Sequence, residues 1–396
     1  MIKTLPLLKS LLCALPLLAG GALFAHASAN EAKDAHWQQT LAQAKGQTVY
    51  FNAWGGSPEI NAYLVWAGQE LERQYQVKLV QVKVDDIAQS VSQLLANKQA
   101  GKDTGGPIDL LWVNGENFKA LKEQGLLGAP FTGDLPNMAQ VDKTLPVSED
   151  FTVPVEGLEA PWGIGQLNFM VNGDLVATPP TSAATLLAWV KEHPGRFTYP
   201  KPPQFHGSSF LKQILLELTA DPAPLYREAT DADFDRLTAP LWAWLDELHP
   251  ALWRKGKLFP ASAAETRQLL DDGELAMAIS FNPQEAQSAV QNGTLPPNVV
   301  AVAMEKGALT NSHFLAIPFN ATARAGAKVV ANFLLSPVAQ ARKAEPAFWG
   351  DPSVLQASAL PVSAKQAPAL RFKAKPEPHP SWQLRLEAAW AERYGH

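Results

Sequence analysis

Cysteine is almost absent from this sequence of 396 residues, in which Cys13 is the only one. It lies within an apolar run, residues 11–25, that follows a positively charged start, and this pattern is typical of a secretory signal peptide. Small residues at Ala27 and Ala29 end two candidate cleavage sites. We therefore expect residues 1–29 to be removed during export, which leaves a mature protein without a thiol. Such a protein has no disulfide, no cysteine nucleophile and no thiolate metal site.

The chain after the signal segment also contains no long apolar run. The run inside that segment is short for a membrane span and is broken by Pro16, so a cleaved signal is favoured over a membrane anchor. The formal net charge is -5, which offers no argument for binding nucleic acid or an anionic membrane. We expect a protein exported to the periplasm.

The motifs of several enzyme classes are missing as well. There is no G-x-S-x-G, H-E-x-x-H or G-x-x-x-x-G-K pattern, and the eight histidines are scattered. Residues 231–236 resemble the start of a calcium loop, but Arg236 stands where such a loop needs glycine. Ser209 and Lys212 match the S-x-x-K pattern of penicillin-recognising serine enzymes, whose S-D-N and K-T-G elements are not found. The sequence thus predicts no enzyme, no cofactor and no metal, and a serine hydrolase stays as an alternative.

What the sequence does contain is a strand, a glycine turn and a helix in direct succession. Residues 49–54 form a β-branched and aromatic run that predicts a buried strand, and Gly55 and Gly56 break it. Ser57 fits an N-cap, and residues 58–75 begin with proline and carry apolar residues at helical spacing. In open α/β sheets, ligands bind at the carboxyl ends of strands. The turn is therefore a candidate ligand site.

Predicted strands alternate with helical periods over most of the chain. After a stretch rich in proline and glycine, one long strand is predicted at residues 162–171, and the alternation then starts again. Other strands are predicted at residues 77–84, 108–113, 196–199, 275–279, 299–303 and 313–317, and helices at residues 37–44, 210–218, 231–248 and 325–335. Such alternation favours mostly parallel sheets with helices on both faces.

Two such alternations predict two lobes, each a mostly parallel sheet flanked by helices and joined by crossover strands. The first lobe is expected to comprise residues 30–163 and 317–362, and the second lobe residues 164–316. Residues 363–396 are expected to form a C-terminal tail and helix. A cleft between two lobes is a common place for a small ligand.

Several motifs then resemble a known family. Residues 50–56 (YFNAWGG), 109–118 (DLLWVNGENF) and 194–200 (PGRFTYP) are similar, in this order, to the YnjB-type branch of the periplasmic substrate-binding proteins of ABC importers. Residues 332–340 (NFLLSPVAQ) resemble a helix ending common in that superfamily. The resemblance covers nearly the whole mature chain. It implies a periplasmic-binding-protein-like α/β fold, a small-molecule ligand, and the permease and ATPase subunits of an importer as partners.

The first half of the chain supplies six candidate ligand contacts, at the ends of two strands. They are Trp54, Gly55, Gly56, Ser57, Asn114 and Glu116. Trp54 could stack on a ring or a cation, and Glu116 would suit a cationic or hydroxylated group. Backbone N–H groups at the start of the following helix would donate hydrogen bonds to an anionic or carbonyl oxygen. The alternative is an ordinary strand-to-helix turn with a core tryptophan.

The second half and the crossover supply eight more candidates. They are Trp162, Gln166, Tyr199, Gly207, Ser208, Ser209, Ser280 and Asn282. Tyr199 is placed at a strand end, where it could stack on the ligand opposite Trp54. Residues 207–209 are expected to open a helix, and they either hold an oxygen-rich group or merely cap that helix. For Trp162 packing is an alternative role, and for His313 a structural role is favoured.

These observations predict a monomeric, two-lobed periplasmic protein that closes on a small ligand and delivers it to a membrane importer. A sensor or chaperone without a transport role is a further alternative. The ligand stays unnamed: helix N-termini favour an anion, whereas Trp54, Tyr199 and Glu116 favour an aromatic or cationic group, and a zwitterion would satisfy both.

Overall fold

The computed structural model describes residues 1, 20–113, 115–362 and 370–395. The elements up to the crossover are α1 (Gly20–Ala44), β1 (Thr48–Trp54), α2 (Pro58–Tyr75), β2 (Lys78–Val84), α3 (Ala88–Gln99), β3 (Leu110–Val113), α4 (Glu116–Glu123), β4 (Glu149–Asp150), β5 (Val153–Pro154) and β6 (Glu159–Gln166). Those of the second half are β7 (Asn168–Asn172), α5 (Ala183–Glu192), α6 (Phe205–Leu218), α7 (Asp231–Leu248), α8 (Ala263–Asp271), β8 (Met277–Ser280), α9 (Glu285–Gln291), β9 (Val299–Val302), β10 (Ala308–Ala316), α10 (Arg324–Leu334), α11 (Pro337–Ala344), β11 (Ala374–Pro376) and α12 (Pro380–Tyr394).

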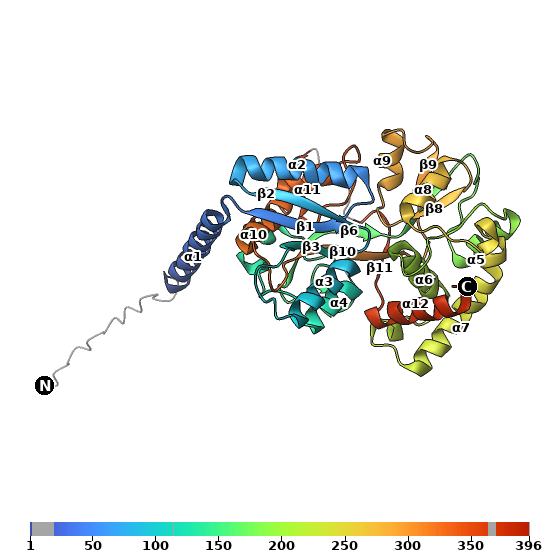
Figure 1. The fold of residues 1–396 in the computed structure, drawn as a ribbon, viewed down its shortest axis with the longest axis horizontal. Helices are drawn as coiled ribbons and strands as arrows, with labels where there is room; N and C mark the ends of the chain where they lie inside the picture. The colour runs from blue at the N-terminus through green and yellow to red at the C-terminus, as the bar shows by residue number, and fades with distance from the viewer. Residues whose placement is uncertain (2–19, 114, 363–369, 396) are drawn as a thin grey trace.

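The first lobe is built on a mixed sheet in the order β11-β10-β3-β1-β2, with β6 also paired to β10. β1 runs parallel to both β2 and β3, and β10 runs antiparallel to β3 and β6. β1 lies between β3 and β2, and its Val49, Phe51 and Ala53 are wholly buried, as the apolar run predicts. Helices α2, α10 and α11 lie on one side of this lobe and α3 and α4 on the other (Figure 1).

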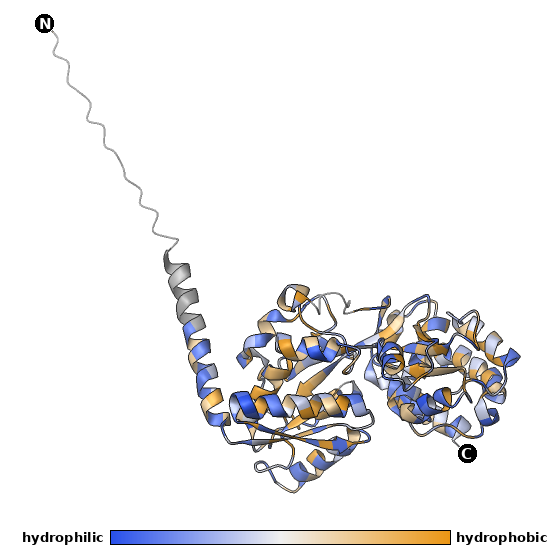
Figure 2. Ribbon diagram, turned by 90° about the horizontal axis from the view of Figure 1, so that it is seen from above, coloured by the Kyte–Doolittle hydropathy of each residue, from blue (hydrophilic) through white to orange (hydrophobic). Residues whose placement is uncertain are grey.

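The second lobe holds a smaller sheet in the order β8-β7-β9. Both pairings to β7 are antiparallel, so the parallel pairing expected in each lobe occurs only in the sheet of the first lobe. The chain enters this lobe along β7 and the returning strands run against it, a direction that residue periodicity does not encode. Its core gathers the aromatic side chains of α6 and α7 with residues of β7. The predicted class, a two-lobed α/β fold, is otherwise what the chain adopts (Figure 2).

The crossover differs from the single long strand predicted at residues 162–171. The structure has two consecutive strands there, β6 and β7, with Leu167 between them. Leu167 donates its N–H to Leu309 O, whereas Gln166 donates its N–H to Phe281 O. The chain is thus hydrogen-bonded to both lobes at the point where it changes from the first sheet to the second. β10 makes the return crossing: its Leu309 lies in the core of the second lobe and its Leu315 in that of the first.

The C-terminal segment, predicted as a separate tail, is shared between the lobes. β11 pairs in parallel with the start of β10. Beyond it, α12 contributes Trp382, Leu386 and Trp390 to the core of the second lobe.

Three local predictions are wrong. Residues 196–199 form no strand, because backbone N–H groups of separate segments (Ala276 and Trp253) bond to the carbonyls of Arg196 and Phe197. Helix α6 begins at Phe205 and not at residues 207–209, because the side chain of Gln204 caps it. β10 begins at Ala308, five residues before the predicted start, since its buried polar residues hide the strand pattern.

The N-terminal predictions meet the structure only in part. The short helix expected at residues 37–44 is the end of the longer α1. The features of the predicted signal up to residue 19, Cys13 among them, lie outside the described residues. Over the part of the chain that is described, no helix combines the length and apolar character needed to cross a membrane.

Candidate functional site

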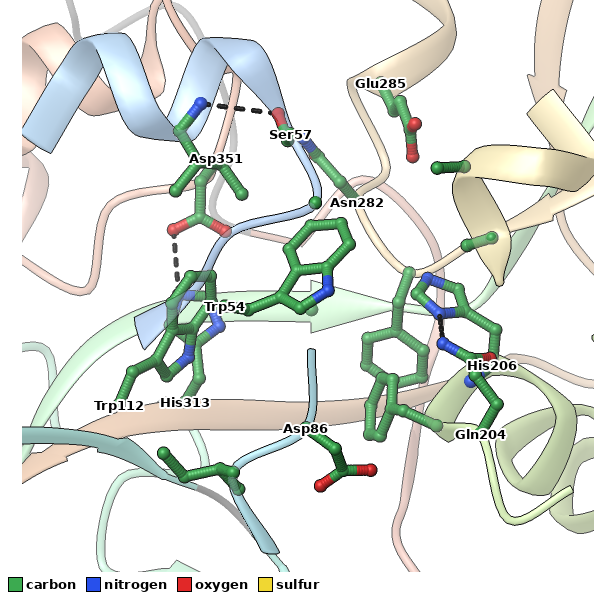
Figure 3. A pocket seen from close by; sticks show the side chains of 18 of the residues that line it. Trp54, Ser57, Asp86, Trp112, Gln204, His206, Asn282, Glu285, His313 and Asp351 are labelled. Atoms are coloured by element: carbon green, nitrogen blue, oxygen red, sulfur yellow. Dashed lines mark hydrogen bonds and ion pairs between the residues drawn. The ribbon is translucent and has the colours of Figure 1, made fainter. Parts of the chain in front are cut away.

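A cavity of about 240 Å³ lies where the two lobes face each other, and both lobes line it. From the first lobe come Trp54, Ser57, Asp85, Asp86, Trp112 and Glu116, at the carboxyl ends of β1, β2 and β3. From the second lobe come Gln204, Phe205, His206, Arg267, Asn282 and Glu285, near the beginnings of α6, α8 and α9. Figure 3 shows the indole of Trp54 in the middle of this space. The cavity is therefore built from strand ends and helix starts, as expected of an α/β ligand site.

The wall around Trp54 depends on its two glycines. The indole lies so close to Gly56 that a Cβ there would overlap the ring. Gly55 donates its N–H to Val84 O at 3.1 Å and does not line the cavity, whereas Gly56 does. Ser57 caps α2 as predicted: its Oγ accepts the N–H of Ile60 at 3.3 Å. Since that hydroxyl also donates to Glu59 at 2.6 Å, the cap is occupied by the protein's own groups.

Glu116 lies in the first turn of α4 and faces the cavity. Its Oε1 accepts a hydrogen bond from Asn117 at 3.2 Å, but its Oε2 is buried without a hydrogen-bond partner among the described residues. Burial raises the pKa of this carboxyl to about 7. Gly115, just before the helix, donates its N–H to Asp150 at 2.6 Å. The predicted contact Asn114 lies outside the described residues.

On the second lobe, the start of α6 presents Gln204 and His206 to the cavity. Gln204 Oε1 accepts the N–H of His206 at 2.8 Å, and burial lowers the pKa of that histidine to about 4. His206 is therefore neutral at pH 7.

The predicted contacts Gly207, Ser208 and Ser209 are not among the lining residues, because α6 starts two residues before them. Gly207 is pressed against the Pro200 carbonyl. Ser208 Oγ donates to Glu387 at 2.6 Å on α12, and the side chain of Ser209 is wholly buried.

Arg267 and Glu285 form the charged part of the second-lobe wall, with 3.7 Å between their closest atoms. Burial raises the pKa of Glu285, although the hydroxyl of Ser280 donates to it. Ser280 is buried behind the wall and does not line the cavity. Asn282 does line it, and its side-chain amide donates to Trp349 O of the first lobe at 3.2 Å. That hydrogen bond joins the two walls.

An aromatic cluster forms the floor on the first-lobe side. Trp112 packs on His313 with ring centres 5.1 Å apart, and His313 Nε2 lies 3.2 Å from Asp351 Oδ2. Burial would raise the pKa of Asp351, but the neighbouring His313 and Lys343 hold it below its ordinary range. Trp162 lies beneath this layer, wholly buried, and so packs the floor without lining the cavity.

Two further predicted contacts lie away from the cavity. Tyr199 is wholly buried in the core of the second lobe, where its hydroxyl lies 2.7 Å from His249 Nε2 and accepts the indole N–H of Trp390 at 2.9 Å. Gln166 is also wholly buried, at the junction of the lobes. Its side chain donates to Thr310 and Phe372 and accepts two backbone N–H groups, so it ties the crossover to the C-terminal segment.

Of the predicted contacts, the cavity thus brings together Trp54, Gly56, Ser57, Glu116 and Asn282. Sequence reasoning missed Asp85 and Asp86, although they follow β2 just as Trp54 ends β1, and the same rule would have found them. It also missed Trp349 and Asp351, which lie in an irregular segment after α11 with no periodic signal.

The S-x-x-K pair that favoured a serine hydrolase is inaccessible. Ser209 is wholly buried, and Lys212 is 1% exposed. Lys212 Nζ lies 2.7 Å from Glu377 Oε2 and donates to Gln383 at 2.8 Å, so it is a charged partner and not a free base. Within the described residues, no group of three His, Cys, Asp or Glu side chains could hold a metal ion.

Comparison with known proteins adds two matches at the level of sequence. A family described as bacterial extracellular solute-binding protein matches residues 66–372. Protein YnjB of Escherichia coli (strain K12) is 48% identical over 364 residues, which cover 91% of this chain and 94% of YnjB.

Solved structures resemble the fold across both lobes. The periplasmic binding protein AfuA of Actinobacillus pleuropneumoniae, with fructose-6-phosphate bound, has a TM-score of 0.64 at 15% identity and covers 88% of this chain and 99% of its own. The spermidine/putrescine substrate-binding protein PotD of Streptococcus pneumoniae has a TM-score of 0.60 at 14% identity, with coverages of 88% and 96%. At such low sequence identity these matches show the fold alone, and they confirm the predicted two-lobed fold class.

Proposed function

Because this chain belongs to the family of bacterial extracellular solute-binding proteins, we propose that it is the solute-binding component of an ABC importer. The family predicted from the sequence motifs is thereby confirmed, and so is solute binding as the function. In the proposed role the protein captures a small solute between its lobes and delivers it to permease and ATPase subunits in the membrane. The observation that carries this proposal is the cavity shared by both lobes.

The connection between the lobes suits a hinge. β6 and β10 cross together from one lobe to the other, paired over most of their length, and the chain changes sheets at Leu167. The opposite walls of the cavity touch where the Asn282 side-chain amide donates to Trp349 O at 3.2 Å. A solute that contacts both walls would favour the closed state by its differential affinity.

Delivery from outside the cytoplasm requires export. In the proposed pathway residues 1–29 act as a signal peptide that is cleaved after Ala27 or Ala29, and the mature monomer works in the periplasm. The extracellular character of the family supports this localisation.

The two solved neighbours do not decide the solute. One is named for polyamines and the other holds a sugar phosphate, so their ligands have opposite charges.

The proposal is tested by titrating solutes against the intrinsic fluorescence of the purified mature protein. A native mass spectrum of protein purified without refolding first identifies any molecule that stays bound. We expect that molecule to change the tryptophan fluorescence, and we expect Trp54→Ala to weaken its binding about tenfold. Trp189→Ala removes a tryptophan from α5, outside the cavity, and should bind as the wild type does.

Two results would count against the proposal. If Trp54→Ala and Trp189→Ala bind the molecule equally well, the solute does not sit in this cavity. If membrane permease components fail to associate with the loaded protein in a pull-down, the role is that of a sensor or chaperone and not of an importer subunit.

A further inference from the structure

The two walls of the cavity differ in charge. The first lobe contributes Glu59, Asp85, Asp86 and Glu116, and no lysine or arginine among its described lining residues. Its fifth carboxylate, Asp351, is already paired with Lys343 and His313. The first-lobe wall is therefore strongly negative.

The second-lobe wall is close to neutral. Its one lining arginine, Arg267, lies 3.7 Å from Glu285, so the two charges offset each other within the wall. Burial keeps His206 uncharged at pH 7. Nothing on this wall therefore offers a free positive charge to an anion among the described lining residues.

Helix N-termini would attract an anion, but those of α2 and α4 in the first-lobe wall already carry carboxylates. Glu59 stands in the first turn of α2 and Glu116 in the first turn of α4. A second negative group placed beside either of them would meet like-charge repulsion with little water to screen it.

Glu116 presents a more specific observation. Its Oε2 is shielded from solvent, has no hydrogen-bond donor among the described residues, and belongs to a side chain that lines the cavity. The positive charge of Lys212 lowers the pKa of Glu116, but Lys212 already forms an ion pair with Glu377 and donates a hydrogen bond to Gln383. A buried carboxylate oxygen without a donor is costly, and a donor carried by the solute would remove that cost.

Aromatic groups complete the first-lobe wall. The indole of Trp54 rests on Gly56 and projects into the cavity, and Trp112 lines the floor (Figure 3). Aromatic faces attract a positive charge electrostatically, so they act in the same direction as the carboxylates.

We propose that the cavity takes a small organic cation, whose N–H-bearing positive group is held by the first lobe against Glu116 and whose uncharged part faces the second lobe. This inference rests on the proposed solute-binding function and specifies its solute class.

The test uses three probes of similar shape and different charge: phenethylammonium, phenethyl alcohol and hydrocinnamate. Calorimetric titration of the mature protein should show the ammonium binding at least about tenfold more tightly than the alcohol, and hydrocinnamate most weakly of the three. The trimethylated ammonium, which keeps the charge but has no N–H, should lose about tenfold relative to the parent cation.

Glu116→Gln is the decisive variant, because it keeps the shape of the side chain and removes its charge. It should weaken phenethylammonium about tenfold to a hundredfold and leave the neutral alcohol unchanged. Glu123→Gln is the matched control on the same helix: Glu123 is exposed, pairs with Lys119 and lies outside the cavity.

The wild-type protein gives an independent readout that needs no variant. Only the ionised form of Glu116 attracts the cation, so affinity should rise as pH increases through about 7, and binding should release a proton. The charged groups facing Glu116 are Lys212 on α6, Glu377 after β11, Glu387 on α12 and Asp150. If Glu116→Gln folds, its loss of this pH dependence assigns the titration to Glu116 and not to those neighbours.

Three results would overturn the inference. They are tighter binding of hydrocinnamate than of the cation, equal affinities of Glu116→Gln and Glu123→Gln for phenethylammonium, and cation affinity that does not change with pH. In each case the proposed solute-binding function survives if a co-purified molecule still depends on Trp54. If Trp54→Ala binds the co-purified molecule as tightly as Trp189→Ala does, the proposed solute-binding function is wrong as well.

Discussion

The indole of Trp54 lies against the backbone of Gly56, where a Cβ atom would overlap three atoms of the ring. A side chain at position 56 would therefore force the indole to move. Since the ring occupies the middle of the cavity, the shape available to a solute depends on the absence of a side chain at position 56 (Figure 3).

Gly56→Ala should displace the indole and lower solute affinity by about tenfold, because the stacking surface would move out of place. Fluorescence titration with the co-purified solute measures the change, and thermal unfolding checks the fold. Gly133→Ala is the matched control, since no atom outside its neighbouring residues lies within 4 Å of a Cβ there. Unchanged affinity in Gly56→Ala would show that the ring is free to move.

Lys212→Met should destabilise the protein by about 3–5 kcal/mol, because Glu377 would keep a buried charge without its partner. The two side chains are 1% and 3% exposed, and Lys212 also lies 4.2 Å from the centre of the Phe151 ring of the first lobe. Urea unfolding gives the free energy, and the loss should shrink at acid pH, where Glu377 is protonated.

The control for this prediction is Lys191→Met, which breaks an exposed pair with Glu247 and should cost less than about 1 kcal/mol. Equal losses in the two variants would mean that the buried pair contributes no more than a surface one.

Glu159→Gln should stabilise the protein increasingly as pH rises. Neither carboxylate oxygen of Glu159 has a hydrogen-bond partner in the described part of the chain, and burial followed by the nearby Asp150 raises its pKa well above the ordinary value. Because the folded-state pKa exceeds the unfolded one, the wild type loses stability from above about pH 4.3 up to the folded-state pKa. The variant has no such loss.

The measurement is the free energy of unfolding of both proteins at pH 5 and pH 8, in urea. The difference should grow by up to about 1.4 kcal/mol per pH unit within that window. Glu156→Gln is the matched control near the same segment: the Glu156 side chain is 63% exposed and pairs with Lys122, so its loss should cost less than about 1 kcal/mol. A constant difference for Glu159→Gln would contradict the assignment.

Gln166→Leu should cost about 2–4 kcal/mol, because several buried backbone and side-chain groups would lose their partner together. Its effect should also be local: the amides of Arg371 and Phe372, which donate to Gln166 Oε1 at 2.9 and 3.0 Å, should exchange hydrogen faster. Hydrogen exchange resolved by residue tests this. Gln268→Leu, an exposed glutamine bonded to Asp272, is the control and should leave that exchange unaltered.

Local chemistry made the first half of the site predictable. The β-branched run before Trp54, the glycine pair and the capping Ser57 act over neighbouring residues, so each is readable from the sequence. Glu116 was found for the same reason, since it begins a helix directly after a strand.

The remainder depends on contacts between distant segments. Tyr199 lies in a core, where the indole of Trp390, almost two hundred positions later in the chain, donates a hydrogen bond to its hydroxyl. No local sequence pattern predicts such a contact between distant residues. Trp349 and Asp351 reach the cavity through an irregular segment after α11, whose backbone carbonyls accept hydrogen bonds from Asn282 and Ser288 of the other lobe.

The position of α12 has a consequence for the order in which the molecule assembles. Trp382, Leu386 and Trp390 fill the interior of the second lobe, yet they are among the last residues of the chain. During synthesis or translocation from the N-terminus, that lobe stays short of three large interior side chains until nearly the whole chain has emerged. The last strand of the first lobe's sheet, β11, precedes α12 in the chain, so the second lobe is the later of the two to be completed.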